Sequence, residues 1–397
     1  MNKKIRTLLV GIGGYGATYV DLLLEGKRSS LFSLVGAVDP YAKDARCFDR
    51  LTAHVPIFDS MDDFFNQQNK SEQAELVIIA SPIHRHYQQC TTALENGANV
   101  LCEKPLVPTL EELDTLQNLA ASKNKLLIVG FQHCYSDVIL SIKQRILAGE
   151  FGRPVNLKCL VSWPRTWKYY ARNSWAGKIK TPEGQMVYDS VISNATAHYI
   201  QNMLYLLGQS MEESATLEDM QAECYRANNI ESFDTIALKG RANGAETLYL
   251  ATHATKYNIQ PIMDYKFEKA RITVNMTTQD YSCIIHHKDG RVEDLGHMLG
   301  QMHGKAQEKN ANDALTALAA RINGQQAFLC TTETVRPFTA LISDIFKKAQ
   351  FHSFPKDLII KDQTAMATYV KNLHMDLYDC FNENKLPKDA ALPWAVV

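Results

Sequence analysis

The strongest constraint in this sequence is the glycine-rich segment GIGGYG at residues 11–16, which directly follows the apolar run IRTLLV and opens a helical pattern. Its spacing is G-x-G-x-x-G. The first glycine permits a tight turn, the next lets the backbone approach a pyrophosphate, and the last allows close packing of helix against strand. The residues of this predicted dinucleotide-binding turn are Gly11, Gly13, Gly14, Tyr15 and Gly16. The order of strand, turn and helix favours this interpretation over a glycine-rich turn that binds nothing.

A carboxylate stands where such a turn needs one. Asp39 ends the second predicted strand, SLVGAV, about twenty residues beyond the glycines. There it can bind both ribose hydroxyls, and it would repel a 2′-phosphate, so NAD is favoured over NADP. Lys43 and Arg46 lie close enough in the sequence to keep NADP as an alternative.

The chain changes character part-way along. Short β-branched runs alternate with helical patterns over the first third, whereas later strands are longer and alternate, with a hairpin signal at Asn243-Gly244. We therefore predict an α/β chain. A Rossmann doubly wound parallel sheet occupies residues 1–130, and an α+β domain with a large, mainly antiparallel open-faced sheet occupies residues 131–397.

Helix boundaries are also readable. Gly97 stands where a C-terminal glycine belongs, and Thr109 with Glu112 predicts an N-terminal capping box. Further helices are predicted at 334–349 and around 361–384, and these C-terminal helices are candidates to pack back on the first domain.

Composition excludes several classes of protein. The 397 residues are 46% hydrophobic and 21% charged, with a net charge of −1, so neither disorder nor binding to nucleic acid or an anionic membrane is favoured. The nine cysteines form no CxxC pair and predict reduced, mostly buried thiols. No apolar stretch approaches membrane-spanning length and the N-terminus lacks a small-residue cleavage site, so we expect a soluble cytoplasmic protein.

Two further motifs make a family resemblance visible. SPIHRH follows the strand ELVIIA, and EKP follows the strand ANVLC. With GIGGYG, this ordered trio resembles the Gfo/Idh/MocA family of NAD(P)-dependent oxidoreductases, closely in the first domain and more loosely in the second. The resemblance implies that Ser81, Pro82 and His86 line the dinucleotide near the nicotinamide. It also implies that Glu103 and Lys104 belong to the cofactor site, with the lysine directed at the nicotinamide and the reacting hydroxyl. The alternative for Lys104 is a surface pair with Glu103.

His84 and His86 form an H-x-H pair that an extended segment would place on one face. No carboxylate or cysteine cluster accompanies the pair. We therefore predict cofactor-loop or core roles for these histidines, and no metal site.

The segment SNATAHYIQN (193–202) is the match to the family's acid/base motif, in which an aspartate precedes a histidine. His198 takes the place of the catalytic histidine, while Asn194 stands where the aspartate would be and Gln201 where a second acid is common. Helical spacing would place these side chains on one face. An amide orients imidazole without supplying charge, so the pKa of His198 is expected to be lower than in a carboxylate pair. Asp189, in an apparent insertion, is a candidate for the missing carboxylate, and a hydrogen-bonded core role for His198 stays open.

The segment WPRTWKYYARNSWAGK (163–178) holds three of the four tryptophans and four basic residues, with no acid. Aromatic faces suit sugar rings, and guanidinium groups suit carboxylates or phosphates. In the family this region borders the substrate pocket; a loop packed by its own aromatics, or a subunit contact, is the alternative. The candidate substrate residues are Trp163, Arg165, Arg172, Asn173, Trp175, Asn194 and His198. In GFQHCYSD (130–137), Cys134 and Asp137 replace the family's usual arginine and proline, which argues against a standard substrate contact there.

The function implied is an NAD(P)-dependent dehydrogenase or reductase acting on CH–OH groups of a sugar, polyol or related small molecule. One alternative is an NAD-dependent glycosidase that oxidises its substrate transiently before elimination. Another is a dinucleotide-binding protein with a decayed active site. The resemblance also implies a homodimer or homotetramer that pairs through the exposed face of the second-domain sheet.

Overall fold

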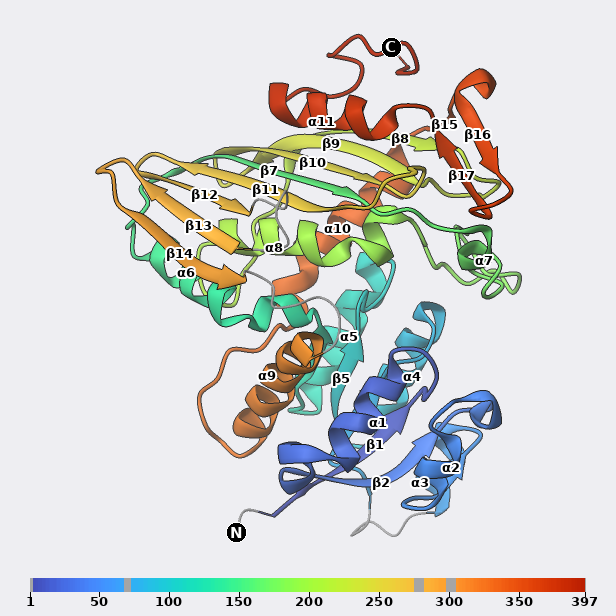
Figure 1. Ribbon diagram of the computed structural model, residues 1–397. Coiled ribbons are helices and arrows are strands. Elements are labelled where there is room, and N and C mark those ends of the chain that lie inside the picture. The colour runs from blue at the N-terminus through green and yellow to red at the C-terminus, as the bar shows by residue number, and fades with distance from the viewer. Residues whose placement is uncertain (1–2, 68–72, 275–281, 298–304, 397) are drawn as a thin grey trace. The chain divides into compact units, whose positions relative to one another are not determined.

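The computed structural model describes residues 3–67, 73–274, 282–297 and 305–396 (Figure 1). The chain divides into two compact units. The first comprises residues 1–135 and 300–336, and the second comprises residues 136–299 and 337–397. The predicted domain boundary after residue 130 stays a prediction, because a compact unit is not by itself a domain that folds independently.

The first unit is built on a parallel sheet in the order β3-β2-β1-β4-β5-β6, which confirms the predicted doubly wound fold. The strands are β1 (Ile5–Val10), β2 (Phe32–Val38), β3 (Ile57–Phe58), β4 (Leu76–Ile79), β5 (Asn99–Glu103) and β6 (Leu127–Gly130). The two-residue strand β3 was not predicted, because so short a run has no readable period. Strand order reverses between β1 and β4, the point at which sheets of this kind bind ligands.

Helices cover this sheet. They are α1 (Gly16–Leu24), α2 (Phe48–Thr52), α3 (Met61–Gln67), α4 (His86–Glu95), α5 (Leu110–Ser122) and α9 (Lys305–Ile322). Leu315 and Leu318 of α9 share one buried cluster with Leu23 of α1 and Ile128 of β6, so a segment late in the chain completes the core of the first unit. The predicted cap of α5 is present, because the Glu112 amide donates to the Thr109 hydroxyl over 3.3 Å.

The second unit is built on a larger mixed sheet in the order β14-β13-β12-β11-β7-β10-β9-β8-β15. Its strands are β7 (Pro154–Ser162), β8 (Glu218–Arg226), β9 (Thr235–Ala242), β10 (Ala245–Thr252), β11 (Ile259–Phe267), β12 (Ala270–Val274), β13 (Ser282–His287), β14 (Val292–His297) and β15 (Phe351–Ser353). Most neighbours are antiparallel, as predicted; β7 with β10 and β8 with β15 are parallel. Asn243 and Gly244 both have positive φ and form the predicted turn between β9 and β10.

The helices of the second unit are α6 (Asp137–Leu147), α7 (Trp167–Tyr170), α8 (Ala197–Leu207), α10 (Thr332–Lys348), which begins in the first unit, and α11 (Leu373–Glu383). The prediction of a helix around 361–384 was wrong for the first half of that segment. There the chain forms the hairpin β16 (Ile359–Asp362) and β17 (Ala367–Val370), consistent with the β-branched residues in both strands. α10 confirms the prediction at 334–349.

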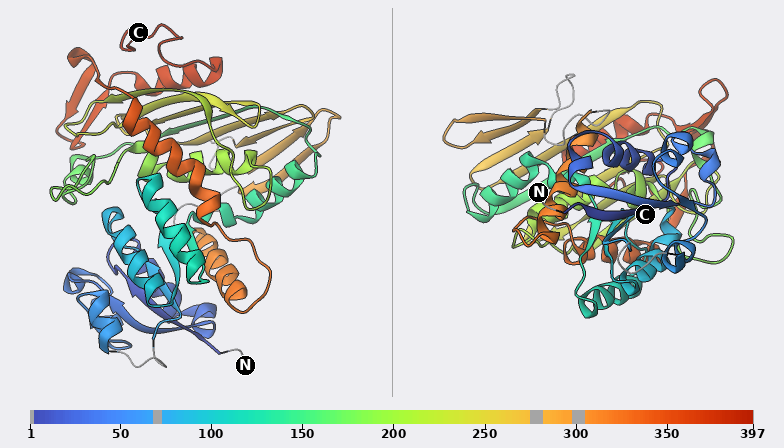
Figure 2. Two further views of the ribbon diagram at one scale, coloured as in Figure 1. Left: turned by 180° about the vertical axis from the view of Figure 1, so that it is seen from behind. Right: turned by 90° about the horizontal axis from the view of Figure 1, so that it is seen from below.

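α11 and the segment after it cover part of the large sheet's outer face, opposite α8, as Figure 1 and Figure 2 both show. Leu377 and Phe381 of α11 share a buried cluster with Leu160 of β7 and Leu250 of β10. Lys158 of β7 donates to the Phe381 carbonyl over 2.9 Å. The face expected to be open for subunit pairing is therefore occupied in part by the chain's own C-terminal region.

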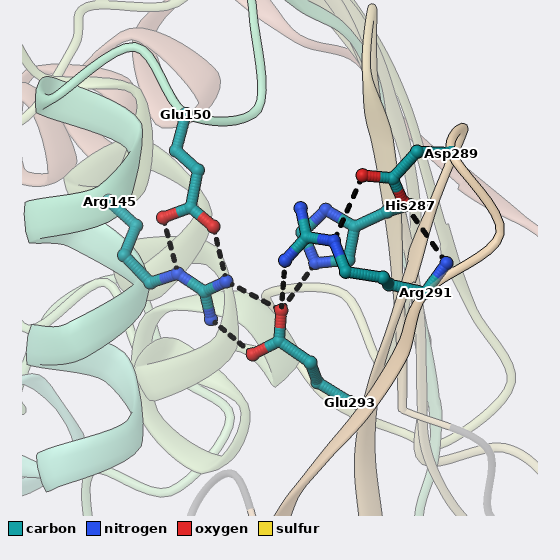
Figure 3. A network of polar contacts seen from close by, with 6 residues as sticks. All are labelled: Arg145, Glu150, His287, Asp289, Arg291 and Glu293. Atoms are coloured by element: carbon teal, nitrogen blue, oxygen red, sulfur yellow. Dashed lines mark hydrogen bonds and ion pairs between the residues drawn. The ribbon is translucent and has the colours of Figure 1, made fainter.

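A salt-bridge network ties the β13–β14 hairpin to the end of α6 (Figure 3). Arg145 donates to Glu150 over 2.8 Å and to Glu293 over 3.1 Å, and the guanidinium lowers the pKa of both carboxyls. His287 and Arg291 pair with Glu293 as well. Although Glu150, His287 and Glu293 together resemble a set of metal ligands, Arg145 already satisfies both carboxylates. The cluster is best described as an ion-pair network.

The nine cysteines are all buried and none of them forms a disulfide, as predicted. No helix in the part of the chain that the structure describes is both long and apolar enough to cross a membrane.

Leu377→Ala tests the cover formed by α11. Leu377 is fully buried, so the truncation should lower the free energy of unfolding of the second unit by about 2–5 kcal/mol through lost burial and a cavity. Urea denaturation measures the change. Met375 of the same helix is 57% exposed, so Met375→Ala is the matched control and should cost much less. Equal effects of the two substitutions would contradict the packing.

Candidate cofactor and catalytic site

The glycine turn is packed so closely that side chains are excluded at two positions. A Cβ on Gly16 would lie 2.0 Å from the Gly11 carbonyl oxygen, and one on Gly11 would lie 2.8 Å from the backbone of Ala80 and Ser81. At Gly13, by contrast, a Cβ would meet no atom within 4 Å. Because Gly11 and Gly16 lack side chains, α1 and the residues that follow β4 can pack closely against the end of β1. Gly13 faces open space, which fits a backbone that must admit a pyrophosphate.

Asp39 lies directly beside this turn. Its carboxylate accepts the Ile12 backbone N–H over 3.0 Å and the Tyr41 N–H over 2.9 Å. The Gly11 N–H donates to the Val38 carbonyl, which holds the end of β2 against the turn. The side chain is therefore fixed at the switch point, half-exposed, where a ribose could reach it.

The SPIHRH loop is held by its last histidine. His86 is 1% exposed, and its ring nitrogens lie 2.9 Å from the carbonyl oxygens of Ser81 and Pro105. The ring therefore joins this loop to the EKP loop through backbone contacts, and burial lowers its pKa. His86 is therefore buried beneath the loop, whereas Pro82 is exposed and Ser81 is half-exposed at the surface of the loop.

Glu103 is buried in a network that the sequence did not reveal. Its Oε1 accepts the Tyr19 hydroxyl over 2.7 Å and the Gln132 side-chain amide over 2.6 Å. A Cβ at Gly130 would lie 2.6 Å from the same oxygen, so glycine leaves the room that the carboxylate needs. Burial raises the pKa of Glu103 to about 7, against the opposing effects of these hydrogen bonds and of the Lys104 charge. The surface pair of Glu103 with Lys104 is thus excluded as the main role of this carboxylate.

Lys104 follows Glu103 at the carboxyl end of β5 and is half-buried. Burial and the positive charge of Lys104 lower the pKa of His133 to about 3, so His133 is neutral beside this cation. Sequence reasoning missed Tyr19, Gln132 and His133 as members of this site. For the last two, the position of GFQH at the end of β6 was the available signal, since strand ends line the ligand crevice. Cys134, the next residue in the chain, is fully buried and therefore offers no contact at the protein surface.

In the second unit, Asp189 does reach the altered motif. Its carboxylate accepts the Asn194 side-chain amide over 2.8 Å and the Gly177 backbone N–H over 2.7 Å. Asp189 is 3% exposed. Asp189 therefore provides a buried carboxylate that is hydrogen-bonded directly to the Asn194 side chain.

The motif does not form one continuous α-helix. Asn194 lies in a π-helical turn, Val191–Ala195, whose Ser190 cap accepts the Ser193 amide. α8 begins only at Ala197, and His198 occupies its first turn, half-buried. The expected grouping of these side chains on one α-helical face is therefore wrong at Asn194.

Gln201 and Asn202 are fully or almost fully buried in α8. The Gln201 amide donates to the Ser214 hydroxyl over 3.1 Å. Gln201 thus contributes to the packing of α8 rather than replacing a second acid at an open surface.

The aromatic segment after β7 packs on itself and on α8. The ring of Trp163 lies edge-on to Tyr199, with centroids 5.6 Å apart, and Trp167 donates to the Thr368 hydroxyl. Asn173 accepts the backbone amides of Trp175 and Ala176, so its side-chain oxygen serves the turn. These contacts support the alternative of a self-packed loop for Asn173, and its predicted substrate role stays a prediction.

The comparisons with known proteins agree with the geometry of the first unit. A family model described as an oxidoreductase family with an NAD-binding Rossmann fold matches residues 5–131. This region belongs to the Gfo/Idh/MocA family. The glycine turn, Asp39 and the SPIHRH and EKP loops therefore lie in an NAD-binding fold, as predicted.

Individual relatives are similar at low identity. An inositol 2-dehydrogenase from Saccharopolyspora erythraea is 28% identical over 53% of this chain and 56% of its own length. The chain spans about half the length of the curated relatives it matches.

Two solved structures share the fold over 87% of this chain. The WlbA dehydrogenase from Bordetella pertussis, in complex with NADH and UDP-GlcNAcA, has a TM-score of 0.69 at 20% identity and is covered over 97% of its length. A super-repressor mutant of Gal80p from Saccharomyces cerevisiae has a TM-score of 0.66 at 15% identity and is covered over 95%. These likenesses establish the fold of this chain.

Glu103→Gln tests the buried carboxyl. A folded-state pKa near 7, above the ordinary value of 4.5, means that the folded protein retains a proton that the unfolded chain loses as pH rises. The stability that this carboxyl contributes should therefore be present below pH about 4.5 and fall by roughly 1–3 kcal/mol on passing through pH about 7. The amide can still accept from Tyr19 and Gln132 but does not titrate. Urea denaturation between these pH values should show a smaller fall in the free energy of unfolding for the variant than for wild type. If the free energy of unfolding depends on pH in the same way for both proteins, the raised pKa of Glu103 is contradicted.

Proposed function

We propose that this chain is an NAD(P)-dependent oxidoreductase that transfers a hydride between the nicotinamide and a hydroxyl or carbonyl group of a sugar, polyol or related small molecule. The observation that carries the proposal is the position of Lys104. It is a half-buried cation at the carboxyl end of β5, within an NAD-binding fold and directly after a carboxylate fixed by Tyr19 and Gln132. An ammonium in that position can stabilise an alkoxide as it develops.

The residues present fit the cofactor. Gly13 leaves open space at the turn, and Asp39 is held beside it by two backbone amides. We infer that the glycine turn binds the pyrophosphate, Asp39 the ribose, and the Ser81–His86 loop the nicotinamide side. NAD supplies the hydride acceptor or donor when it is bound. The choice of NAD over NADP rests on Asp39.

For the proton, we assign His198 as the acid/base group. It lies in the first turn of α8, and Asn194 connects the preceding turn to the Asp189 carboxylate. Because the Asp189 carboxylate bonds the Asn194 amide instead of the imidazole, it stabilises the charged form of His198 less than a directly paired carboxylate would. His198 should therefore be a weaker base than a histidine in a direct pair. A homodimer or homotetramer is expected from the family resemblance, with α11 restricting the sheet face available for pairing.

A second candidate is a dinucleotide-binding regulatory protein without turnover. The shared fold with Gal80p and the replacement of the motif aspartate by Asn194 favour it. An NAD-dependent glycosidase is the further alternative. It would release an aglycone from aryl glycosides with no net NADH change.

Lys104→Met distinguishes these candidates. Wild type should form or consume NADH with members of a panel of polyols, sugars and their keto forms, and the variant should lose about 100-fold or more in kcat/KM because alkoxide stabilisation is lost. NADH absorbance under steady-state conditions is the measurement.

Lys123→Met is the matched control, since Lys123 is an exposed lysine of the same unit. It should retain wild-type rates and wild-type affinity for NADH. NADH binding with no turnover of any panel member by wild type would sink the oxidoreductase proposal. Release of an aglycone from aryl glycosides would then indicate the glycosidase, and its absence would favour the regulatory candidate.

A further inference from the structure

A cleft of the second unit lies where the loop after β8 meets the β16–β17 hairpin and α7. Its volume is about 1240 Å³, which is ample for a phosphorylated monosaccharide. Neither Asn194 nor His198 lines it, so it is not the pocket of the proposed acid/base group. Five of the residues that line the cleft offer groups for binding: Trp167, Arg226, Asn228, Lys356 and Lys361.

Contacts within the second unit hold the walls of this cleft. Buried Asp234 accepts the backbone N–H groups of Ala227 and Asn228 over 3.1 Å and 2.9 Å, which fixes the loop after β8 from inside. At the other elements, the Trp167 backbone N–H donates to the Met366 carbonyl over 2.7 Å. Figure 1 and Figure 2 both show α7 and the β16–β17 hairpin at the same end of the large sheet. The cleft is therefore formed before any ligand binds.

The charges on the lining are mostly positive. Three cations line the cleft: Arg226, Lys356 and Lys361. Among the described residues, the one carboxylate of the lining is that of Glu231, and it already pairs with Lys178 over 2.8 Å. Neither lysine of the lining forms an ion pair within the described part of the chain. The cleft therefore favours an anionic ligand.

Arg226 and Asn228 add groups with a fixed direction. Nη1 of Arg226 donates to the Glu231 carbonyl over 3.0 Å, whereas its Nε and Nη2 meet no acceptor among the residues that the structure describes. Asn228 is 7% exposed, and its side chain donates to Asp234 over 2.8 Å. Only the amide nitrogen can donate to a carboxylate, so the orientation of this amide is set. Its oxygen meets no donor in the described residues and is left to accept one from a ligand.

Trp167 supplies an aromatic ring whose position is fixed. Its indole N–H donates to the Thr368 hydroxyl of β17 over 2.9 Å, and the residue is half-buried. Because the polar edge of the indole is already bonded, the ring offers the cleft apolar surface. An aromatic surface of this kind suits the C–H face of a sugar ring.

We propose that this cleft binds a phosphorylated sugar. The three cations bind the phosphate, Asn228 Oδ1 accepts from a sugar hydroxyl, and Trp167 packs against the ring. Guanidinium and ammonium groups are the usual protein donors to phosphate. A phosphate monoester carries a charge of about −1.5 to −2 at pH 7, which matches three cations better than the single charge of a carboxylate. The site is additional to the proposed oxidoreductase activity and does not rest on it.

Calorimetric titration of the full chain tests the site with three probes: D-glucose 6-phosphate, D-glucose and inorganic phosphate. Excess NADH is present throughout, so that the dinucleotide competes for the glycine turn. Glucose 6-phosphate should bind with a Kd below about 1 mM, about 10-fold or more tightly than glucose and about threefold or more tightly than inorganic phosphate. Absence of binding, or an affinity no greater than that of either other probe, would overturn the proposal.

The double variant Lys356→Met/Lys361→Met locates the binding. Both lysines are exposed, so the fold should be retained, while the affinity for glucose 6-phosphate should fall about 10-fold or more. Lys371→Met is the matched control, because Lys371 is an exposed lysine directly after β17 that does not line the cleft. It should bind glucose 6-phosphate like wild type.

Circular dichroism checks that both variants are folded. A folded double variant with wild-type affinity would show that glucose 6-phosphate binds elsewhere, and would overturn the proposal. An equal loss of affinity in Lys371→Met would also overturn it, since the effect would then reflect general surface charge. None of these measurements depends on turnover of NADH.

Discussion

The close approach of backbone segments at the glycine turn is the constraint on which the first unit depends. A Cβ on Gly16 would meet the Gly11 carbonyl oxygen at 2.0 Å, and a Cβ on Gly11 would meet the end of β4 at 2.8 Å. Only because these positions lack side chains can α1 begin directly against β1 and β4. That packing brings Asp39 and the loop after β4 to one switch point of the sheet. Cofactor binding is therefore a consequence of how the first strands and helix fit together.

A buried carboxylate lies near each of the two residues that we propose as catalytic. Hydrogen bonds from Tyr19 and Gln132 hold the side chain of Glu103, the residue directly before Lys104. Asp189 holds Asn194 in the turn that precedes His198. In each case an acidic residue acts on its neighbour from inside the protein. The segment that resembles the family's acid/base motif is thus hydrogen-bonded to a carboxylate, Asp189, that lies outside the motif.

Local patterns predicted much of this structure. The apolar run before GIGGYG, the capping residue Thr109 and the Asn243-Gly244 turn each act over a few residues, and each was confirmed. The failures involve tertiary contacts. The Glu103 network joins residues 84 and 29 positions apart, which no periodicity records. Likewise the β16–β17 hairpin is paired by its own strands where a helix was expected. The π-helical turn before α8 depends on the Ser190 cap and on Asp189, neither of which the motif contains.

Direct binding of the reduced dinucleotides is the measurement that tests the central claim most directly. Fluorescence titration of the full chain with NADH should show saturable binding, with NADPH bound about 10-fold or more weakly because Asp39 repels the 2′-phosphate. Failure of NADH to saturate, or tighter binding of NADPH, would contradict the assignment of the switch point beside Asp39 as an NAD site.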